Sequence, residues 1–81
     1  MKIKLYTNEL PMGSCALFGK ELIECFGIEP DKAFQTAKEM FLGVYKVATP
    51  LEVEANPGCS AEVFLLKCKQ YGIVAEKMNC D

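Results

Sequence analysis

Alternating apolar and polar residues predict three short strands. At residues 2–7, lysines alternate with isoleucine and leucine, the period of a strand that buries one face and exposes its charges. The segments VYKVAT at 44–49 and IVAEKM at 73–78 predict the second and third strands. The segment LEVEANPG at 51–58 alternates apolar and acidic residues, and it predicts either an extension of an edge strand or an irregular loop.

Apolar residues that recur every three or four positions predict three helices, near 15–26, 30–42 and 57–71. Each predicted helix is flanked by residues that favour a helix end. These are Ser14 and Gly27 for the first helix, Pro30 and Gly43 for the second, and Asn56, Pro57 and Gly72 for the third. The predicted order of elements is therefore β-α-α-β-α-β.

The expected fold is an α+β two-layer sandwich, in which three helices cover one face of a three-stranded sheet. This is the smallest arrangement that buries the apolar face of the sheet together with one stripe of each helix. A chain of 81 residues is expected to form one domain, spanning 1–81. The side chains expected to be largely buried are those of Phe18, Leu22, Phe34, Ala37, Leu65 and Cys68.

The charged residues argue against nucleic acid as a partner. Nine lysines oppose eleven carboxylates, which gives a formal net charge of −2, and the chain contains no arginine. Without arginine there is no bidentate group for guanine or phosphate, and the charge balance provides no basic field. Histidine, the commonest general base and metal ligand, is also absent from the sequence. The sequence therefore favours a protein that is not an enzyme and that needs no cofactor.

The five cysteines favour reduced thiols and a cytoplasmic protein. Their number is odd, they form no Cys-x-x-Cys pair, and the chain shows neither a secretory leader nor an apolar run long enough for a membrane. Cys25 and Cys68 lie on the predicted core faces of helices, where a free cysteine behaves as a small apolar side chain. A zinc site needs four ligands at close spacing, and the cysteines do not provide them. They stand at positions 15, 25, 59, 68 and 80.

Several short motifs resemble a known family. In ClpS adaptors of protein degradation, the first strand runs into an Asn-Asp-Asp turn and Pro-Met opens the first helix; the matching stretch here is 8–12, NELPM. The family's second helix ends in His-x-x-Gly, and MFLG at 40–43 has Met40 at the histidine and Gly43 at the glycine. The segments 33–41 and 61–78 resemble the C-terminal domain of the bacterial ribosomal stalk protein, which shares the ClpS fold. The resemblance implies the same α+β fold over nearly the whole chain.

The resemblance also implies a site for the first residue of a substrate. In ClpS the polar turn binds the free amino group and the methionine borders an apolar pocket. On this basis Asn8 and Glu9 would hold the amine, while Met12 and Met40 would line the pocket. Leu10 stands where the family has its second aspartate. The acidic residue and lysine with which the family docks on its unfoldase correspond to Cys59 and Phe64.

A dense apolar run around the end of the second predicted helix extends this candidate site. Part of the run must enter the core, and the remainder is expected to form an exposed surface for a partner. The run consists of Met40, Phe41, Leu42, Val44 and Tyr45. The residues expected to bind a partner or peptide are Asn8, Glu9, Met12, Met40, Phe41 and Tyr45.

The interpretation is a small protein-binding module, a divergent ClpS-like adaptor, regulator or inhibitor. Its expected partner is another protein: a protease or unfoldase component, a substrate peptide or a translation factor, with no membrane or nucleic acid. A stalk-type alternative places the partner on helix faces around Lys38, Lys67 and Lys69.

A second alternative is a thiol-redox protein similar to glutaredoxin, whose nucleophilic cysteine follows the first strand. Cys15 and Cys59 each precede or begin a predicted helix, where the helix N-terminus lowers the pKa of a thiol.

Overall fold

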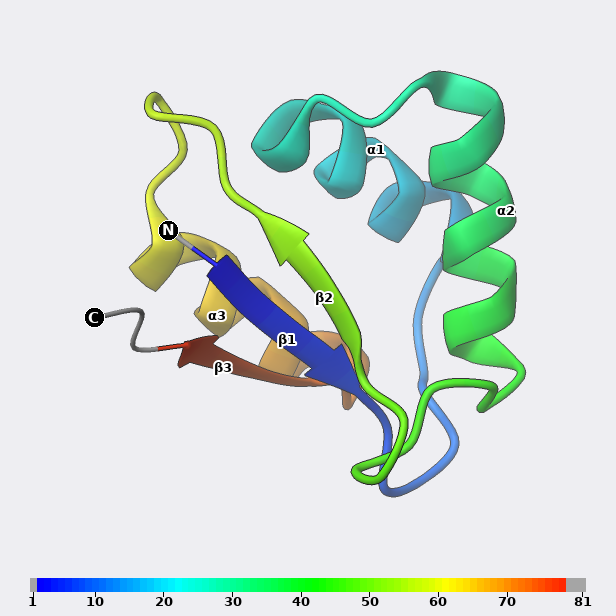
Figure 1. Cartoon of the computed structure of the whole chain (residues 1–81). Coiled ribbons are helices and arrows are strands. Elements are labelled where there is room, and N and C mark those ends of the chain that lie inside the picture. Colours follow the sequence, from blue (N-terminus) through cyan, green and yellow to red (C-terminus); the bar gives the residue numbers. More distant parts are fainter. Residues whose placement is uncertain (1, 79–81) are drawn as a thin grey trace.

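The computed structural model describes residues 2–78 and shows the expected α+β fold (Figure 1). The elements follow the predicted order β-α-α-β-α-β. They are β1 (Lys2–Tyr6), α1 (Cys15–Phe26), α2 (Pro30–Phe41), β2 (Leu51–Glu54), α3 (Ala61–Tyr71) and β3 (Val74–Met78).

The three strands form one antiparallel sheet with β1 in the centre, in the order β2-β1-β3. On the outer face, Lys4 stands between Glu52 of β2 and Glu76 of β3. Its Nζ lies 3.5 Å from Oε2 of Glu76, and the hydroxyl of Tyr6 donates a hydrogen bond of 3.0 Å to Oε1 of the same carboxylate. A slip of one residue would turn these charges into the core, so the alternation determines the register.

The inner face of the sheet is covered by the helices. Ile3 and Leu5 of β1 are fully buried on this face. Figure 1 shows α3 behind the sheet, with α1 and α2 packed against each other beside it. All three helices contribute to one core, to which the sheet adds its inner side chains. Its buried helical members are Phe18, Leu22, Cys25, Phe26, Ala33, Ala37, Met40, Ala61, Phe64 and Cys68.

The second strand lies later in the chain than 44–49, so that part of the prediction is wrong. Residues 44 and 45 are irregular, and residues 46–49 form a turn in which the backbone N–H of Thr49 donates to the carbonyl of Lys46 at 3.0 Å. The strand is Leu51–Glu54, which confirms the edge-strand alternative. The glutamates of this segment lie opposite Lys2 and Lys4 of β1, and such cross-strand pairs of opposite charge favour it as the neighbour of β1.

The third helix begins later than predicted. Ser60 is its N-cap, and its hydroxyl accepts a hydrogen bond from the backbone N–H of Val63. Asn56 instead donates its backbone N–H to the carbonyl of Cys25 at 2.8 Å and accepts from the N–H of Cys59 at 2.9 Å. Residues 56–59 thus form a turn against the end of α1, and the helical hydrogen bonds begin with the N–H of Phe64, which donates to the carbonyl of Ser60.

The predicted core is correct except at two positions. Phe18, Leu22, Ala37 and Cys68 are buried, but Leu65 is only half-buried. Phe34 is 39% exposed, because the inward positions of α2 are Ala33, Ala37 and Met40. Its ring covers the surface of α1 instead of entering the core.

Candidate functional site

Two loops at the same end of the sheet carry most of the residues predicted to bind a partner (Figure 1). The β1–α1 loop comprises residues 7–14, and the α2–β2 loop comprises residues 42–50. Thr7 joins them, because its backbone N–H and its hydroxyl both donate to the carbonyl of Tyr45, at 3.0 and 3.1 Å. Thr7 is buried, so water competes little for these hydrogen bonds.

The β1–α1 loop is also attached to the end of α3. The backbone N–H of Met12 donates to the carbonyl of Tyr71 at 2.8 Å. Gly13 has a φ of 93°, and a Cβ at this position would lie 3.1 Å from the ring of Tyr71. The loop backbone is therefore held on both sides, while the side chains of Leu10 and Met12 remain 83% and 65% exposed.

The α2–β2 loop exposes three further apolar side chains, Leu42, Val44 and Val47. Tyr45 is half-buried, and its hydroxyl donates to Oε1 of Glu39 at 3.4 Å. Burial, followed by the negative charge of Glu39, raises the pKa of Tyr45 above its ordinary value. We call the five exposed apolar residues of the two loops the loop surface: Leu10, Met12, Leu42, Val44 and Val47.

The six predicted site residues occupy different depths. Asn8, Glu9 and Met12 are exposed, and Phe41 and Tyr45 are half-buried. Phe41 packs against the rings of Phe18 and Tyr71, whose centroids lie 6.0 and 6.1 Å from its own.

Met40 is fully buried in the core, so its side chain offers no surface to a partner. Sequence reasoning did not single out Val47, because the residue fell within the wrongly placed strand. Leu10 was noted only as a departure from the family, although a leucine within a polar turn is itself a sign of an exposed apolar group.

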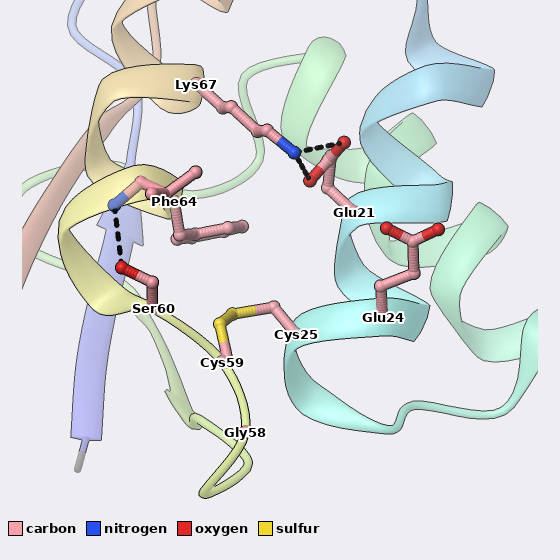
Figure 2. A pocket seen from close by; sticks show the side chains of 9 residues that line it. Glu21, Glu24, Cys25, Gly58, Cys59, Ser60, Phe64 and Lys67 are labelled. Atoms are coloured by element: carbon pink, nitrogen blue, oxygen red, sulfur yellow. Dashed lines mark hydrogen bonds and ion pairs between the residues drawn. A yellow bond between two sulfur atoms is a disulfide. The ribbon is translucent and has the colours of Figure 1, made fainter.

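A second candidate site is a groove between α1 and α3 (Figure 2). Its end is formed by a disulfide between Cys25, in the last turn of α1, and Cys59, one residue before the N-cap of α3. The two Cα atoms are 5.1 Å apart. The groove has a volume of about 230 Å³ and includes Glu21, Glu24, Phe64 and Lys67 among its lining residues.

An ion pair crosses the same groove. Nζ of Lys67 lies 3.2 and 3.0 Å from the two carboxylate oxygens of Glu21. The hydrogen bond to Glu21, followed by the charge of that carboxylate, raises the pKa of Lys67. Glu24 lies beside this pair in Figure 2 and belongs to neither of the ion pairs found among residues 2–78.

The disulfide contradicts the expectation that all cysteines are reduced. The sequence placed Cys25 in the core as an apolar residue, and Cys59 at the wrongly predicted start of the third helix. Because α3 starts at Ala61, Cys59 lies in the preceding turn, against the end of α1. Cys15 is a half-buried free thiol and Cys68 a buried one, while Cys80 lies outside the described residues.

The two positions that correspond to the unfoldase-docking residues of ClpS provide no charged side chain on the surface. Cys59 is half-buried in the disulfide, and Phe64 is buried against Phe26, with ring centroids 4.8 Å apart.

Among residues 2–78 there is no cluster of three or more side chains suited to hold a metal ion. In the same part of the chain, no helix combines the length and apolar character needed to cross a membrane.

Comparisons of the chain with protein-family models, with curated proteins and with solved structures found no match. The resemblance to the ClpS family therefore stays a prediction from the sequence.

Proposed function

We propose that this chain is a small, non-enzymatic protein-binding module that acts in the cytoplasm as a divergent ClpS-like adaptor, regulator or inhibitor. The observation that carries the proposal is the loop surface. Five large apolar side chains are exposed on two loops whose backbones are hydrogen-bonded to each other or to α3. An apolar surface on a well-held backbone costs little conformational entropy when a partner covers it.

The charges beside the loop surface favour a peptide or protein partner. The chain has no arginine and a formal net charge of −2. Asn8 and Glu9 are exposed next to Leu10, and they supply oxygen acceptors suited to an amino group. A segment with an apolar side chain and a positive charge would complement both features.

Two features support the remaining parts of the proposal. The absence of histidine from the sequence removes the commonest general base, which argues against an enzyme. Cys15 and Cys68 are free thiols, which a reducing compartment such as the cytoplasm favours, whereas the Cys25–Cys59 disulfide is the feature that is unusual for that compartment.

Capture of partners from a bacterial lysate, followed by mass spectrometry, tests the proposal with three variants. Met12→Asp and Tyr45→Ala are expected to lose the partner that the unaltered protein retains. For a side chain central to an interface the loss is on the order of 2 kcal/mol, about thirtyfold in affinity. Leu66→Asp is the matched control, since Leu66 is an apolar residue of α3 that is 61% exposed, close to the exposure of Met12.

The stalk-type alternative predicts the opposite pattern. Charge reversal of Lys38, Lys67 and Lys69 would then abolish capture, while Met12→Asp would not. Lys67 is already paired with Glu21, which leaves Lys38 and Lys69 as the exposed cations of that surface. Circular dichroism of each variant establishes that the fold is unchanged.

A further inference from the structure

We propose that Cys25 and Cys59 form a thiol–disulfide exchange site that reacts with an uncharged or cationic dithiol presented by another protein. The proposal goes beyond the binding function and does not depend on it. It stands on the geometry of the disulfide and of the groove beside it (Figure 2).

The two cysteines differ in their exposure to solvent. Cys25 is only 5% exposed, whereas Cys59 is half-buried and lies in the turn before α3. An incoming thiolate must approach the sulfur along the axis of the S–S bond, and only a sulfur with solvent access allows this. The residue attacked is therefore Cys59, and Cys25 is the sulfur that leaves.

The position of Cys59 favours its thiolate in the reduced protein. It precedes Ser60, the N-cap of a helix of 11 residues, and the N-terminus of a helix carries a partial positive charge. Cys25 lies in the last turn of α1, at the partially negative end of that helix. This asymmetry makes Cys59 the nucleophile and Cys25 the resolving cysteine when the disulfide forms again.

One dithiol molecule supplies both thiolates that reduce the Cys25–Cys59 disulfide. Its first thiolate bonds to Sγ of Cys59, the Cys25–Cys59 bond breaks, and Cys25 takes up a proton from water. The second thiolate of the dithiol then attacks the mixed disulfide at the dithiol's own first sulfur and releases Cys59 as a thiolate. Two electrons pass to the chain, and the dithiol leaves as a disulfide.

The groove selects against an anionic thiol. Glu21 is neutralised by Lys67, but Glu24 adds a carboxylate near Cys25 without an ion pair of its own. The carboxylate of Glu24 repels a thiol that carries net negative charge, such as glutathione, but does not repel an uncharged dithiol.

Three contacts of this region do not involve the sulfur atoms. The backbone N–H of Asn56 donates to the carbonyl of Cys25, Phe26 packs edge-on against Phe64, and Lys67 pairs with Glu21. Reduction is therefore expected to leave the fold in place, as a reversible reaction requires.

Reduction of the native protein by dithiothreitol, and separately by glutathione, tests the proposal. The reaction is stopped with acid, free thiols are alkylated and the sites are read by mass spectrometry, in a background with Cys15→Ser and Cys80→Ser. Dithiothreitol is expected to reduce the disulfide without denaturant while circular dichroism stays unchanged. Glutathione is expected to form the mixed disulfide about tenfold more slowly than 2-mercaptoethanol, an uncharged monothiol, at equal thiolate concentration. Glu24→Gln is expected to narrow this difference in rate.

Two variants of the same background complete the test. Cys25→Ser leaves Cys59 and Cys59→Ser leaves Cys25, each together with the buried Cys68, whose modification is counted separately by mass spectrometry. Iodoacetamide is expected to modify Cys59 about tenfold faster than Cys25. Equal rates, a faster Cys25, or a disulfide that opens only in denaturant would overturn the proposal. Failure of the reduced protein to form the disulfide again with oxidised dithiothreitol would also overturn it.

Discussion

The ring of Phe34 on α2 lies directly over Gly19 of α1. A Cβ built at Gly19 would stand 2.5 Å from Cδ1 of Phe34 and 2.8 Å from Cε1. Because glycine has no side chain, α1 and α2 can approach each other closely here, and the ring of Phe34 covers the backbone of α1. Gly19 itself is buried, because the ring of Phe34 covers it.

This contact predicts that Gly19→Ala has opposite effects in two backgrounds. In the unaltered protein the extra methyl group overpacks the contact, at a cost of about 1–3 kcal/mol. Alanine also favours the helix by about 1 kcal/mol, so we expect a net destabilisation on the order of 1 kcal/mol. With Phe34→Ala the clash disappears and the same substitution is expected to stabilise. Urea unfolding of the four proteins measures the cycle, and effects of equal sign would contradict the proposed contact.

Removal of an aromatic ring is expected to cost more at Phe18 than at Phe34. Phe18 is fully buried and packs against the rings of Phe41, Phe64 and Tyr71. Phe18→Ala should therefore cost about 3–5 kcal/mol, comparable to the whole stability of so small a domain. Phe34 keeps 39% of its surface exposed, and Phe34→Ala should cost clearly less, about 1–2 kcal/mol. Thermal unfolding compares the stabilities of the two variants. A larger loss of stability for Phe34→Ala would contradict the central position of Phe18 in the core.

The buried thiol of Cys68 predicts a loss of stability at alkaline pH. Burial, with a further contribution from the charge of Glu21, raises the pKa of this thiol from 9.0 to about 12. Above pH 9 the unfolded chain releases the proton that the folded chain retains, so the stabilisation is complete below pH 9 and is lost as pH rises toward 12. The loss is on the order of 4 kcal/mol over this range.

Cys68→Ala provides the control for this effect. It removes the titrating group, so its free energy of unfolding should fall less steeply between pH 9 and 11 than that of the unaltered protein. Tyr6 and Tyr45 also have raised pKa values and titrate in both proteins, so their contribution cancels in the difference. The charge of Cys68 contributes to the raised pKa of Tyr71, so the difference between the two proteins reports Cys68 together with its coupling to Tyr71. Parallel stability curves for the two proteins would exclude Cys68 as the cause.

The sequence patterns predicted the elements where local and tertiary preferences agree. The first strand and the first two helices are correct because their alternation, their apolar stripes and residues such as Ser14, Gly27 and Pro30 favour the same structure. The segment 44–49 has strand-forming residues, but β1 pairs with Leu51–Glu54, whose glutamates face its lysines. A local pattern cannot reveal this choice of partner.

The candidate sites could be predicted only in part, for a related reason. The exposure of Met12 follows from the loop that Pro11 and Gly13 predict, whereas the sequence pattern placed Tyr45 in a strand that the structure does not form. Burial of Met40 depends on the rotation of α2 against α1, where Ala33 and Ala37 allow close approach. The Cys25–Cys59 pair depends on the turn before α3 returning to the end of α1, a contact between residues 34 positions apart. Neither feature has a local signal in the sequence.

The ClpS-like part of the proposed function predicts recognition of a free amino group. A fluorescent peptide that begins with phenylalanine should bind to the loop surface, and acetylation of its N-terminus should weaken binding. A hydrogen bond to a charged group contributes about 1.5–3 kcal/mol, so the loss should be about ten- to a hundredfold. Fluorescence anisotropy measures both peptides.

Glu9→Gln tests which carboxylate holds the amine. It removes the charge of an exposed loop residue, and the preference for the free amine should shrink with it. Glu52→Gln is the matched control. Glu52 is also an exposed carboxylate, but it lies on β2, opposite Lys4 on the outer face of the sheet, and belongs to neither loop. If the acetylated peptide binds as tightly as the free one, or if Glu52→Gln has the effect expected of Glu9→Gln, then the loop surface does not recognise an N-terminus. The loop surface would then bind its partner through apolar contacts alone. In that case Met12→Asp is expected to weaken the binding of the free and the acetylated peptide equally.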